Sequence, residues 1–240
     1  MKNFQPEDQD LLHKESGILT ASLQRRSFLQ YAGAGAAGIA LVAAGCKKDK
    51  QNSPGSTTGV DLGSGDVGIL NYAYALEQLE AAFYTAVVQS PYSGISAYEM
   101  ALLTDIRDHE VAHREFFKKA LGASAIIGLT VDFSSINFSV RQNVLATAKA
   151  FEDLGVSAYN GAGNLIKSAD YLLLAGKIVS VEARHAALIR DLITDGTFAD
   201  STVIDLNGLD AARAPKDVLA MAQVYVKTTI NGSNLPTATS

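Results

Sequence analysis

The sequence predicts an all-α fold, in which a four-helix bundle of two antiparallel hairpins is followed by a short fifth helix. Apolar side chains recur at helical spacing in four segments between positions 67 and 192, where prolines are rare. Short links join the first two segments and the last two, whereas eighteen residues, 122–139, separate the pairs. A link of that length can run along a whole bundle, so it predicts one long crossover between two hairpins.

The region before the bundle is expected to be an export signal. Arg25 and Arg26 are followed by Ser-Phe-Leu and by a short apolar run, 31–45, and this pattern resembles the twin-arginine export signal. A poor transmembrane anchor is the alternative, although a spanning helix needs about 20 strongly apolar residues. The pattern therefore predicts export to the bacterial envelope, with the twin-arginine machinery as a partner and the periplasm as the destination.

Cys46 ends the stretch Leu-Val-Ala-Ala-Gly-Cys, which resembles a lipobox with Ala43 in place of the usual Leu. We expect Cys46 to carry lipid that anchors the protein to a membrane, and an ordinary cleavage site nearby is the alternative. Residues 47–66 are polar and rich in Gly and Ser, which predicts a flexible linker. We expect the bundle over 67–195 and a C-terminal extension over 196–240.

Apolar periodicity and helix-breaking residues set the expected limits of the helices. The first helix is followed by Ser-Pro-Tyr-Ser-Gly, the second by Gly122, and the fifth begins with Pro215, a residue suited to a first helical position. The expected helices are Val67–Gln89, Ile95–Leu121, Val140–Gly161, Ala169–Leu192 and Pro215–Lys227.

Composition excludes several kinds of site. Cys46 is the only cysteine, so neither a disulfide nor a thiolate-bound metal can form within one chain. The net charge of −5 is mild, and no basic stripe with interleaved aromatic residues is present. Nucleic acid is therefore not an expected partner.

Carboxylates occupy helix faces that should be buried. Glu77 and Glu80 are the only charged residues between positions 67 and 89, and both lie in or beside the apolar stripe. Glu152 adjoins apolar residues of the third helix in the same way. A buried carboxylate is costly unless it is paired or bound to a metal ion, so these positions indicate a polar site inside the bundle.

Two Glu-x-x-His motifs add imidazoles to these carboxylates. Glu110 precedes His113 on the second helix, and Glu182 precedes His185 on the fourth. Residues three apart share one helical face, so each pair points the same way. The pairs are unlikely to arise by chance, because the chain has only four histidines. His109 adjoins Glu110 and is expected to face solvent or a neighbouring helix.

An internal repeat joins these motifs into two equivalent halves. Tyr84 follows Glu77 by seven residues, and Tyr159 follows Glu152 by the same interval. Both tyrosines fit as core aromatics or as hydroxyl donors to the ligand carboxylates. Each half supplies one lone Glu and one Glu-x-x-His, and two such hairpins bring four carboxylates and two imidazoles together. That set is typical of bundles that bind two iron or two manganese ions.

The segments Leu76–Tyr84 and Val181–Ala187 resemble the ferritin-like domain family that includes plant and bacterial desiccation-related proteins, and more distantly rubrerythrins and manganese catalases. The resemblance covers residues 68–191. It implies a ferritin-like bundle and six metal ligands: Glu77, Glu110, His113, Glu152, Glu182 and His185. Glu80 is left open as a seventh ligand, a nearby base or a residue at the edge of the core.

Within this set, Glu110 and Glu182 are expected to bridge the two metals and Glu77 and Glu152 to be terminal ligands. The leading hypothesis is an oxidoreductase that uses a small oxidant, dioxygen or peroxide, with ferroxidase, peroxidase or catalase-like chemistry. The alternative is a non-enzymatic desiccation or stress-associated envelope protein whose metal site is structural or vestigial. A storage cage is a third option, and assembly into a homo-oligomer is left open.

Overall fold

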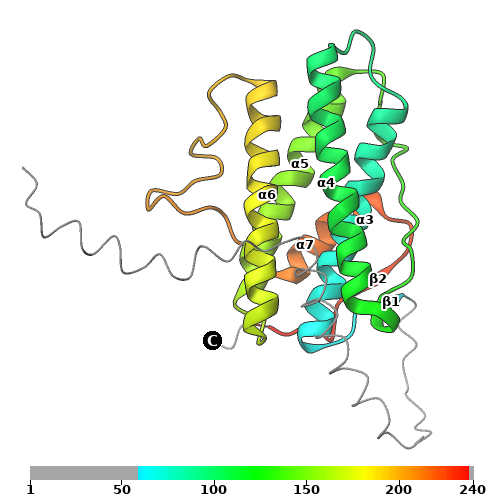
Figure 1. The fold of residues 1–240 in the computed structure, drawn as a ribbon, viewed down its shortest axis with the longest axis vertical. Helices are drawn as coiled ribbons and strands as arrows, with labels where there is room; N and C mark the ends of the chain where they lie inside the picture. Colours follow the sequence, from blue (N-terminus) through cyan, green and yellow to red (C-terminus); the bar gives the residue numbers. More distant parts are fainter. Residues whose placement is uncertain (1–58, 238–240) are drawn as a thin grey trace, which may run out of the picture. The chain divides into compact units, whose positions relative to one another are not determined.

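The computed structural model describes residues 59–237, and their main body is a helical bundle (Figure 1). Its four long helices pack as two pairs, α3 with α4 and α5 with α6. Their limits are α3 Gly65–Gln89, α4 Ala97–Leu121, α5 Arg141–Gly163 and α6 Ala169–Ile193. The predicted all-α bundle of two hairpins is confirmed. Arg25, Arg26 and Cys46 lie outside the described residues, so export and lipidation stay predictions.

Polar side chains set several helix ends. Ser96 accepts a hydrogen bond from the Glu99 amide at 3.0 Å, so α4 begins two residues later than Ile95, the predicted start. Ser168 caps α6 in the same way, with the Tyr171 amide 3.4 Å from its hydroxyl oxygen. These caps satisfy backbone amides that the first helical turn leaves unpaired.

α3 is the central helix, because other parts of the chain cover nearly all of its faces. Its outer face carries the crossover that follows the short 3₁₀ helix η2 (Gly122–Ser124). Asn71 accepts a hydrogen bond from the Ile126 amide at 3.0 Å and donates one to the Ser124 carbonyl at 3.0 Å. Two turns along, Gln78 accepts from the Leu129 amide at 2.8 Å. These two side chains hold the crossover against α3.

The C-terminal extension packs on the bundle as well. Helix α7 (Pro215–Ala222) contacts α5 and α3, and a 3₁₀ helix, η3 (Gln223–Tyr225), follows it. Strand β2 (Ile230–Asn231) pairs in parallel with β1 (Val60–Asp61). The fifth helix is therefore shorter than the predicted Pro215–Lys227, because the Gln223 side chain hydrogen-bonds to later backbone groups and turns the chain toward β2.

The predicted linker over 47–66 also needs a correction at its C-terminal end. Val60 and Asp61 form β1, and the next residue, Leu62, is fully buried. The Asp66 carboxylate accepts hydrogen bonds from the Lys167 and Ser168 amides, which ties the start of α3 to the α5–α6 link. Residues 59–66 are thus part of the packed domain, whereas 47–58 lie outside the described residues.

No helix within residues 59–237 combines the length and the apolar character that crossing a bilayer requires.

Candidate metal centre

The four long helices bring the six predicted ligands together in the middle of the bundle. α3 supplies Glu77 and α5 supplies Glu152, while α4 and α6 each supply a Glu-x-x-His pair. All four glutamates are 0% exposed, and His185 is 4% exposed. A surface helix would leave such groups in water, so their burial needs a compensating partner.

The six residues form two overlapping groups of four. Glu77 and His113 complete one group, Glu152 and His185 complete the other, and Glu110 and Glu182 belong to both. Within each group, one candidate ligand atom per residue lies within 4.8 Å of all the others. This arrangement can hold two cations side by side, with the two shared carboxylates between them.

Two tyrosines hold the unshared glutamates from opposite sides. The Tyr84 hydroxyl on α3 donates a 2.5 Å hydrogen bond to Glu152 Oε1 on α5. The Tyr159 hydroxyl on α5 donates to Glu77 Oε1 on α3. Burial, followed by the charge of the partner glutamate, raises the pKa of both hydroxyls well above the usual value, so both stay protonated and can donate.

The remaining polar atoms of the cluster lack hydrogen bonds. Among residues 59–237, ten buried side-chain nitrogen or oxygen atoms have no hydrogen-bond partner, and eight of them belong to the six candidate ligands. They are Glu77 Oε2, Glu152 Oε2, both oxygens of Glu110 and of Glu182, and Nδ1 of His113 and His185. The shared glutamates thus leave both oxygens free, and the unshared ones leave one. These residues fit a pair of bound cations.

Short contacts within the cluster agree with a shared centre. His113 Nδ1 lies 2.8 Å from Glu182 Oε1, and His185 Nδ1 lies 2.8 Å from Glu110 Oε1, yet neither contact has hydrogen-bond geometry. Each histidine therefore turns its Nδ1 toward carboxylate oxygens. Oxygen and imidazole ligands in this combination suit iron or manganese.

Without metal ions, burial and the crowded carboxylates make the cluster hold protons. Burial raises the pKa of Glu77 well above its usual value, and repulsion from Glu182 adds to this effect. Burial likewise raises the pKa of Glu152 to about 8. Burial lowers the pKa of His113 and of His185, but the surrounding carboxylates outweigh it and raise both to about 12. Protons on these groups stand in for cations.

Glu110 behaves in the opposite way. Burial pushes its pKa up, but the adjacent imidazoles of His113 and His185 outweigh burial and hold the pKa at about 2. The carboxylate of Glu110 is therefore charged in the metal-free protein and is available as a ligand.

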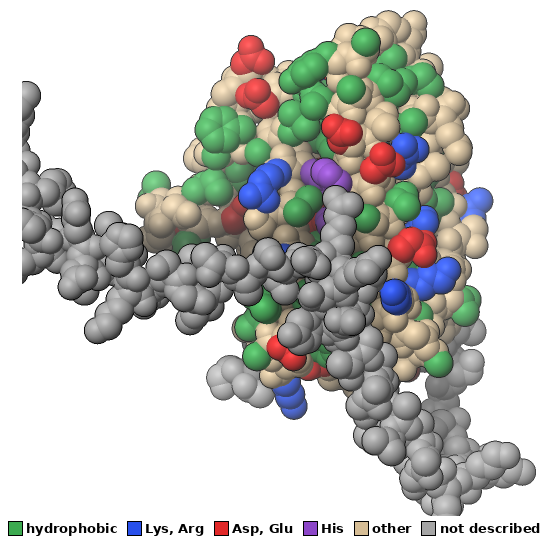
Figure 2. Space-filling model, viewed as in Figure 1, with side chains coloured by type: hydrophobic (Ala, Val, Ile, Leu, Met, Phe, Trp, Pro, Cys, Tyr) green, Lys and Arg blue, Asp and Glu red, His purple; other side chains and the backbone are tan. Residues whose placement is uncertain are grey.

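His109 is close to the cluster but belongs to neither group. Its ring stacks on that of His185 with the planes 7° apart, and its Nδ1 lies 3.0 Å from His185 Nε2. In the neutral tautomer that could bind a cation through Nδ1, Nε2 of His185 carries the proton and donates this hydrogen bond to His109. The predicted contact with a neighbouring helix is present, and the side chain is also exposed. Figure 2 shows histidine side chains on the viewed surface.

Sequence reasoning did not assign this contact between His109 and His185. The available signal was spacing, because His109 precedes His113 by four residues and so lies on the same face of α4.

Glu80 is buried beside the cluster and outside both groups. It is 4% exposed, and its Oε1 would lie 3.0 Å from a Cβ added at Gly155, so the glycine on α5 makes room for it. Burial, followed by repulsion from Glu110 and Glu182, raises its pKa well above the usual value. The geometry favours a protonated neighbour of the site over a seventh ligand.

A buried ion pair near the site was not anticipated. Arg190 on α6 is 4% exposed and makes two hydrogen bonds to Asp153 on α5, at 2.8 and 2.7 Å. Its third hydrogen bond reaches Thr202 of the C-terminal extension at 2.9 Å. Asp153 directly follows Glu152, so this pair helps to fix the part of α5 that presents a ligand.

Comparison with known proteins agrees with the geometry. The family model for the ferritin-like domain matches residues 65–195, which contain all six candidate ligands. A comparison with curated proteins finds no match.

Proposed function

The chain belongs to the ferritin-like domain family, and from this premise and the buried cluster we propose that it is a di-metal carboxylate protein that reacts with dioxygen or peroxide. The eight unpartnered buried atoms that converge on one centre are the observation that carries this proposal. A carboxylate cluster kept only for structure would satisfy these atoms with hydrogen bonds, as Tyr84 and Tyr159 do for the other two glutamate oxygens.

In this proposal Glu110 and Glu182 would hold both ions, and each pair of unshared residues would hold one of them. Glu77 and His113 belong to one ion, and Glu152 and His185 to the other. Two iron or manganese ions bound there would supply the redox chemistry for a small oxidant.

The surrounding side chains orient the ligands and limit access. Tyr84 and Tyr159 fix the unshared carboxylates, and His109 fixes the ring of His185. Apolar residues of α3 and α5 exclude bulk water from the buried side, whereas His109 and the half-buried His113 lie on the side that solvent reaches. The site is thus screened on one side and approachable on the other.

Metal content and oxidant consumption test this function together. The purified protein should bind close to two metal ions per chain and consume dioxygen or peroxide when loaded with iron or manganese. Glu110→Ala should reduce both ions, because both share that carboxylate, whereas His185→Ala should mainly reduce one. Two bound ions without consumption of either oxidant would favour a non-enzymatic stress protein with a structural metal site. Equal, sub-stoichiometric metal in the wild type, Glu110→Ala and His185→Ala would exclude the metal site.

We also propose that the protein is exported by the twin-arginine route and anchored by lipid at Cys46. The supporting observations are Arg25 and Arg26 ahead of the apolar run and the lipobox-like stretch that ends at Cys46. Export of a folded chain would allow the metal to be inserted before translocation.

Cell fractionation tests both parts of this proposal. Replacing Arg25 and Arg26 with Lys should retain the chain in the cytoplasm, and Cys46→Ser should release it from the membrane. Normal delivery of the doubly substituted chain would contradict the export proposal, and unchanged membrane attachment of Cys46→Ser would contradict lipidation.

A further inference from the structure

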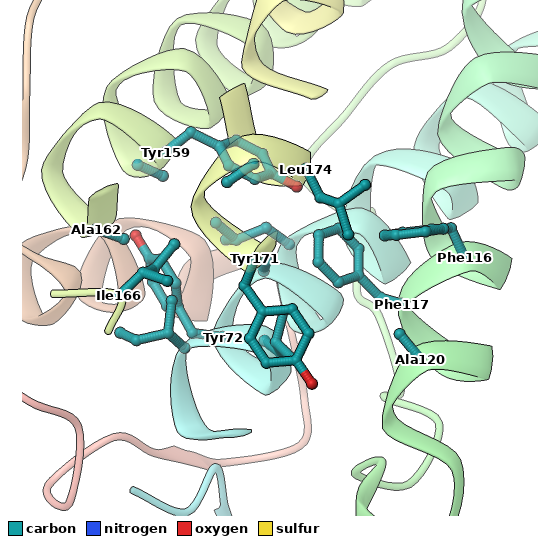
Figure 3. A pocket seen from close by; sticks show the side chains of 15 residues that line it. Tyr72, Phe116, Phe117, Ala120, Tyr159, Ala162, Ile166, Tyr171 and Leu174 are labelled. Atoms are coloured by element: carbon teal, nitrogen blue, oxygen red, sulfur yellow. The ribbon is translucent and has the colours of Figure 1, made fainter. Parts of the chain in front are cut away.

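An apolar cavity of about 30 Å³ lies at the end of the bundle where α3 and α6 begin and α4 and α5 end. All four helices contribute to its wall (Figure 3). Three tyrosines line it, and every other lining side chain is a hydrocarbon or an aromatic ring. No residue of the six-ligand cluster belongs to the wall.

The wall of the cavity includes side chains nearer the surface and side chains nearer the cluster. Phe116 and Leu174 on its outer side are half-buried, whereas Ala158 and Tyr159 on its inner side are buried. The Tyr159 hydroxyl is hydrogen-bonded to Glu77. The inner end of the cavity is therefore one tyrosine ring away from a candidate metal ligand.

One polar group in this wall has no partner. Tyr72 is 1% exposed, and its hydroxyl has no hydrogen bond. In Figure 3 its side chain reaches from α3 toward Ala162 on α5. Burial, followed by the charge of Glu80, raises the pKa of Tyr72, so the hydroxyl remains a donor. A buried water makes two to four hydrogen bonds, whereas Tyr72 supplies the one buried hydroxyl of this wall that lacks a partner.

Size and lining together define the ligand. An apolar cavity of about 150 Å³ holds benzene, and about 10–15 Å³ holds one water, so a void of 30 Å³ admits a molecule of two or three atoms. An apolar diatomic gas meets both conditions, and an oxygen atom of such a molecule could accept the free Tyr72 hydrogen bond.

We propose that this cavity binds dioxygen and delivers it along Tyr159 to the Glu77 side of the cluster. Delivery rests on the proposed function, whereas gas binding does not. A polar oxidant such as peroxide would instead approach past the exposed His109, where hydrogen-bonding groups replace the apolar wall. The molecule thus offers separate approaches to an apolar and a polar oxidant.

Xenon gas tests binding without any metal. Crystals of the full chain under xenon pressure should show one anomalous peak between Ala158, Ala162 and Tyr72. Ala162→Val should remove the peak by filling the space, and Tyr72→Phe should retain it. Ala146→Val is the matched control, because this alanine lies on the same helix and is exposed. A wild-type cavity without xenon, or one occupied by an ordered water that xenon does not displace, would overturn gas binding.

Rates test delivery in the metal-loaded protein. After reduction, oxidation by dioxygen should be several-fold slower in Ala162→Val than in wild type or Ala146→Val, while oxidation by peroxide should be unchanged. Equal dioxygen rates, or an equal slowing with both oxidants, would overturn the delivery route. If the chain binds no metal, the proposed function fails, and xenon alone still decides the cavity. Should Ala162→Val fail to fold, Ala73→Val fills the same cavity from α3.

Discussion

His109 is not a candidate ligand, but its contact with His185 can orient the ring of that ligand. The His185 tautomer that carries its proton on Nε2 can donate a hydrogen bond to His109 Nδ1, and the same tautomer leaves Nδ1 of His185 free for a cation. His109→Ala should therefore weaken the affinity of the site by about 10–100-fold. His109→Gln should restore much of it, because an amide oxygen can accept the same hydrogen bond.

Competition with a chelator, read as metal bound per chain, measures this effect. Arg184→Ala is a suitable control, since Arg184 lies on α6 beside His185 but is exposed and hydrogen-bonds to Ser180 of its own helix. Equal affinity in wild type and His109→Ala would remove the positioning role.

The two tyrosines allow each of the two proposed metal positions to be tested separately. Tyr159→Phe leaves a buried oxygen of Glu77 without its partner, whereas Tyr84→Phe does so for Glu152. Leaving such a group unsatisfied costs about 1–3 kcal/mol. We expect Tyr159→Phe to lower occupancy mainly beside His113, and Tyr84→Phe mainly beside His185.

Anomalous diffraction at the metal edge reads the two occupancies in one crystal. The two variants serve as controls for each other, because each removes one hydroxyl from an equivalent position. The same loss at both positions in both variants would show that the tyrosines act on the bundle as a whole and not on single ligands.

At the scale of elements, a close approach on α5 fixes the C-terminal extension. The Arg213 amide donates to the Ser157 carbonyl at 2.9 Å, and its guanidinium donates to the Ser157 hydroxyl at 2.6 Å. A Cβ at Gly161 would lie 1.8 Å from the Arg213 carbonyl oxygen, so only glycine permits this contact.

Gly161→Ala should therefore push the extension away from α5 and destabilise the protein by about 1–3 kcal/mol. Gly176→Ala is the matched control, because a Cβ there meets no atom within 4 Å in the middle of α6. That change should stabilise the protein by about 0.5–1 kcal/mol. Thermal unfolding measures both, and a Gly161→Ala protein as stable as wild type would contradict the packing argument.

The sequence predicted the long helices well and the smaller elements poorly. Each long helix carries several turns of apolar periodicity, so its limits shifted by at most two residues. Strands β1 and β2 have two residues each, and they pair across 170 positions from Val60 to Ile230. No local pattern predicts such a pairing, and the composition of 47–66 resembles that of a linker along its whole length.

The candidate site follows the same division. Glu-x-x-His spacing and the internal repeat name residues that share a helix face, and the structure brings all six together. The contacts of Tyr84 with Glu152 and of His109 with His185 depend on how helices from different hairpins are rotated. Sequence spacing describes one helix at a time, so it identified the participants but not these pairings. That the cluster holds metal stays a prediction.

For the whole molecule, the buried charges make stability depend on metal and on pH together. The pKa of Glu152 rises from 4.5 to about 8 on folding. The stability that its protonation contributes is therefore fully present below pH 4.5 and is lost as pH rises toward 8. The raised pKa of Glu77 acts in the same direction. His113 and His185 add to the loss above about pH 6.5, because their folded pKa is about 12.

Metal-free protein should therefore melt at a lower temperature at pH 8 than at pH 5.5, whereas bound cations should replace the protons and flatten this dependence. Glu110 does not oppose the trend, since its pKa of about 2 affects stability only in acid.

Glu152→Gln sharpens the measurement, because the amide needs no proton and its oxygen can still accept a hydrogen bond from Tyr84. At pH 8 the metal-free variant should melt above the metal-free wild type, and with metal the order should reverse because a ligand is lost. Parallel pH curves for the metal-free and metal-loaded wild type, followed by calorimetry, would show that cations do not occupy this cluster.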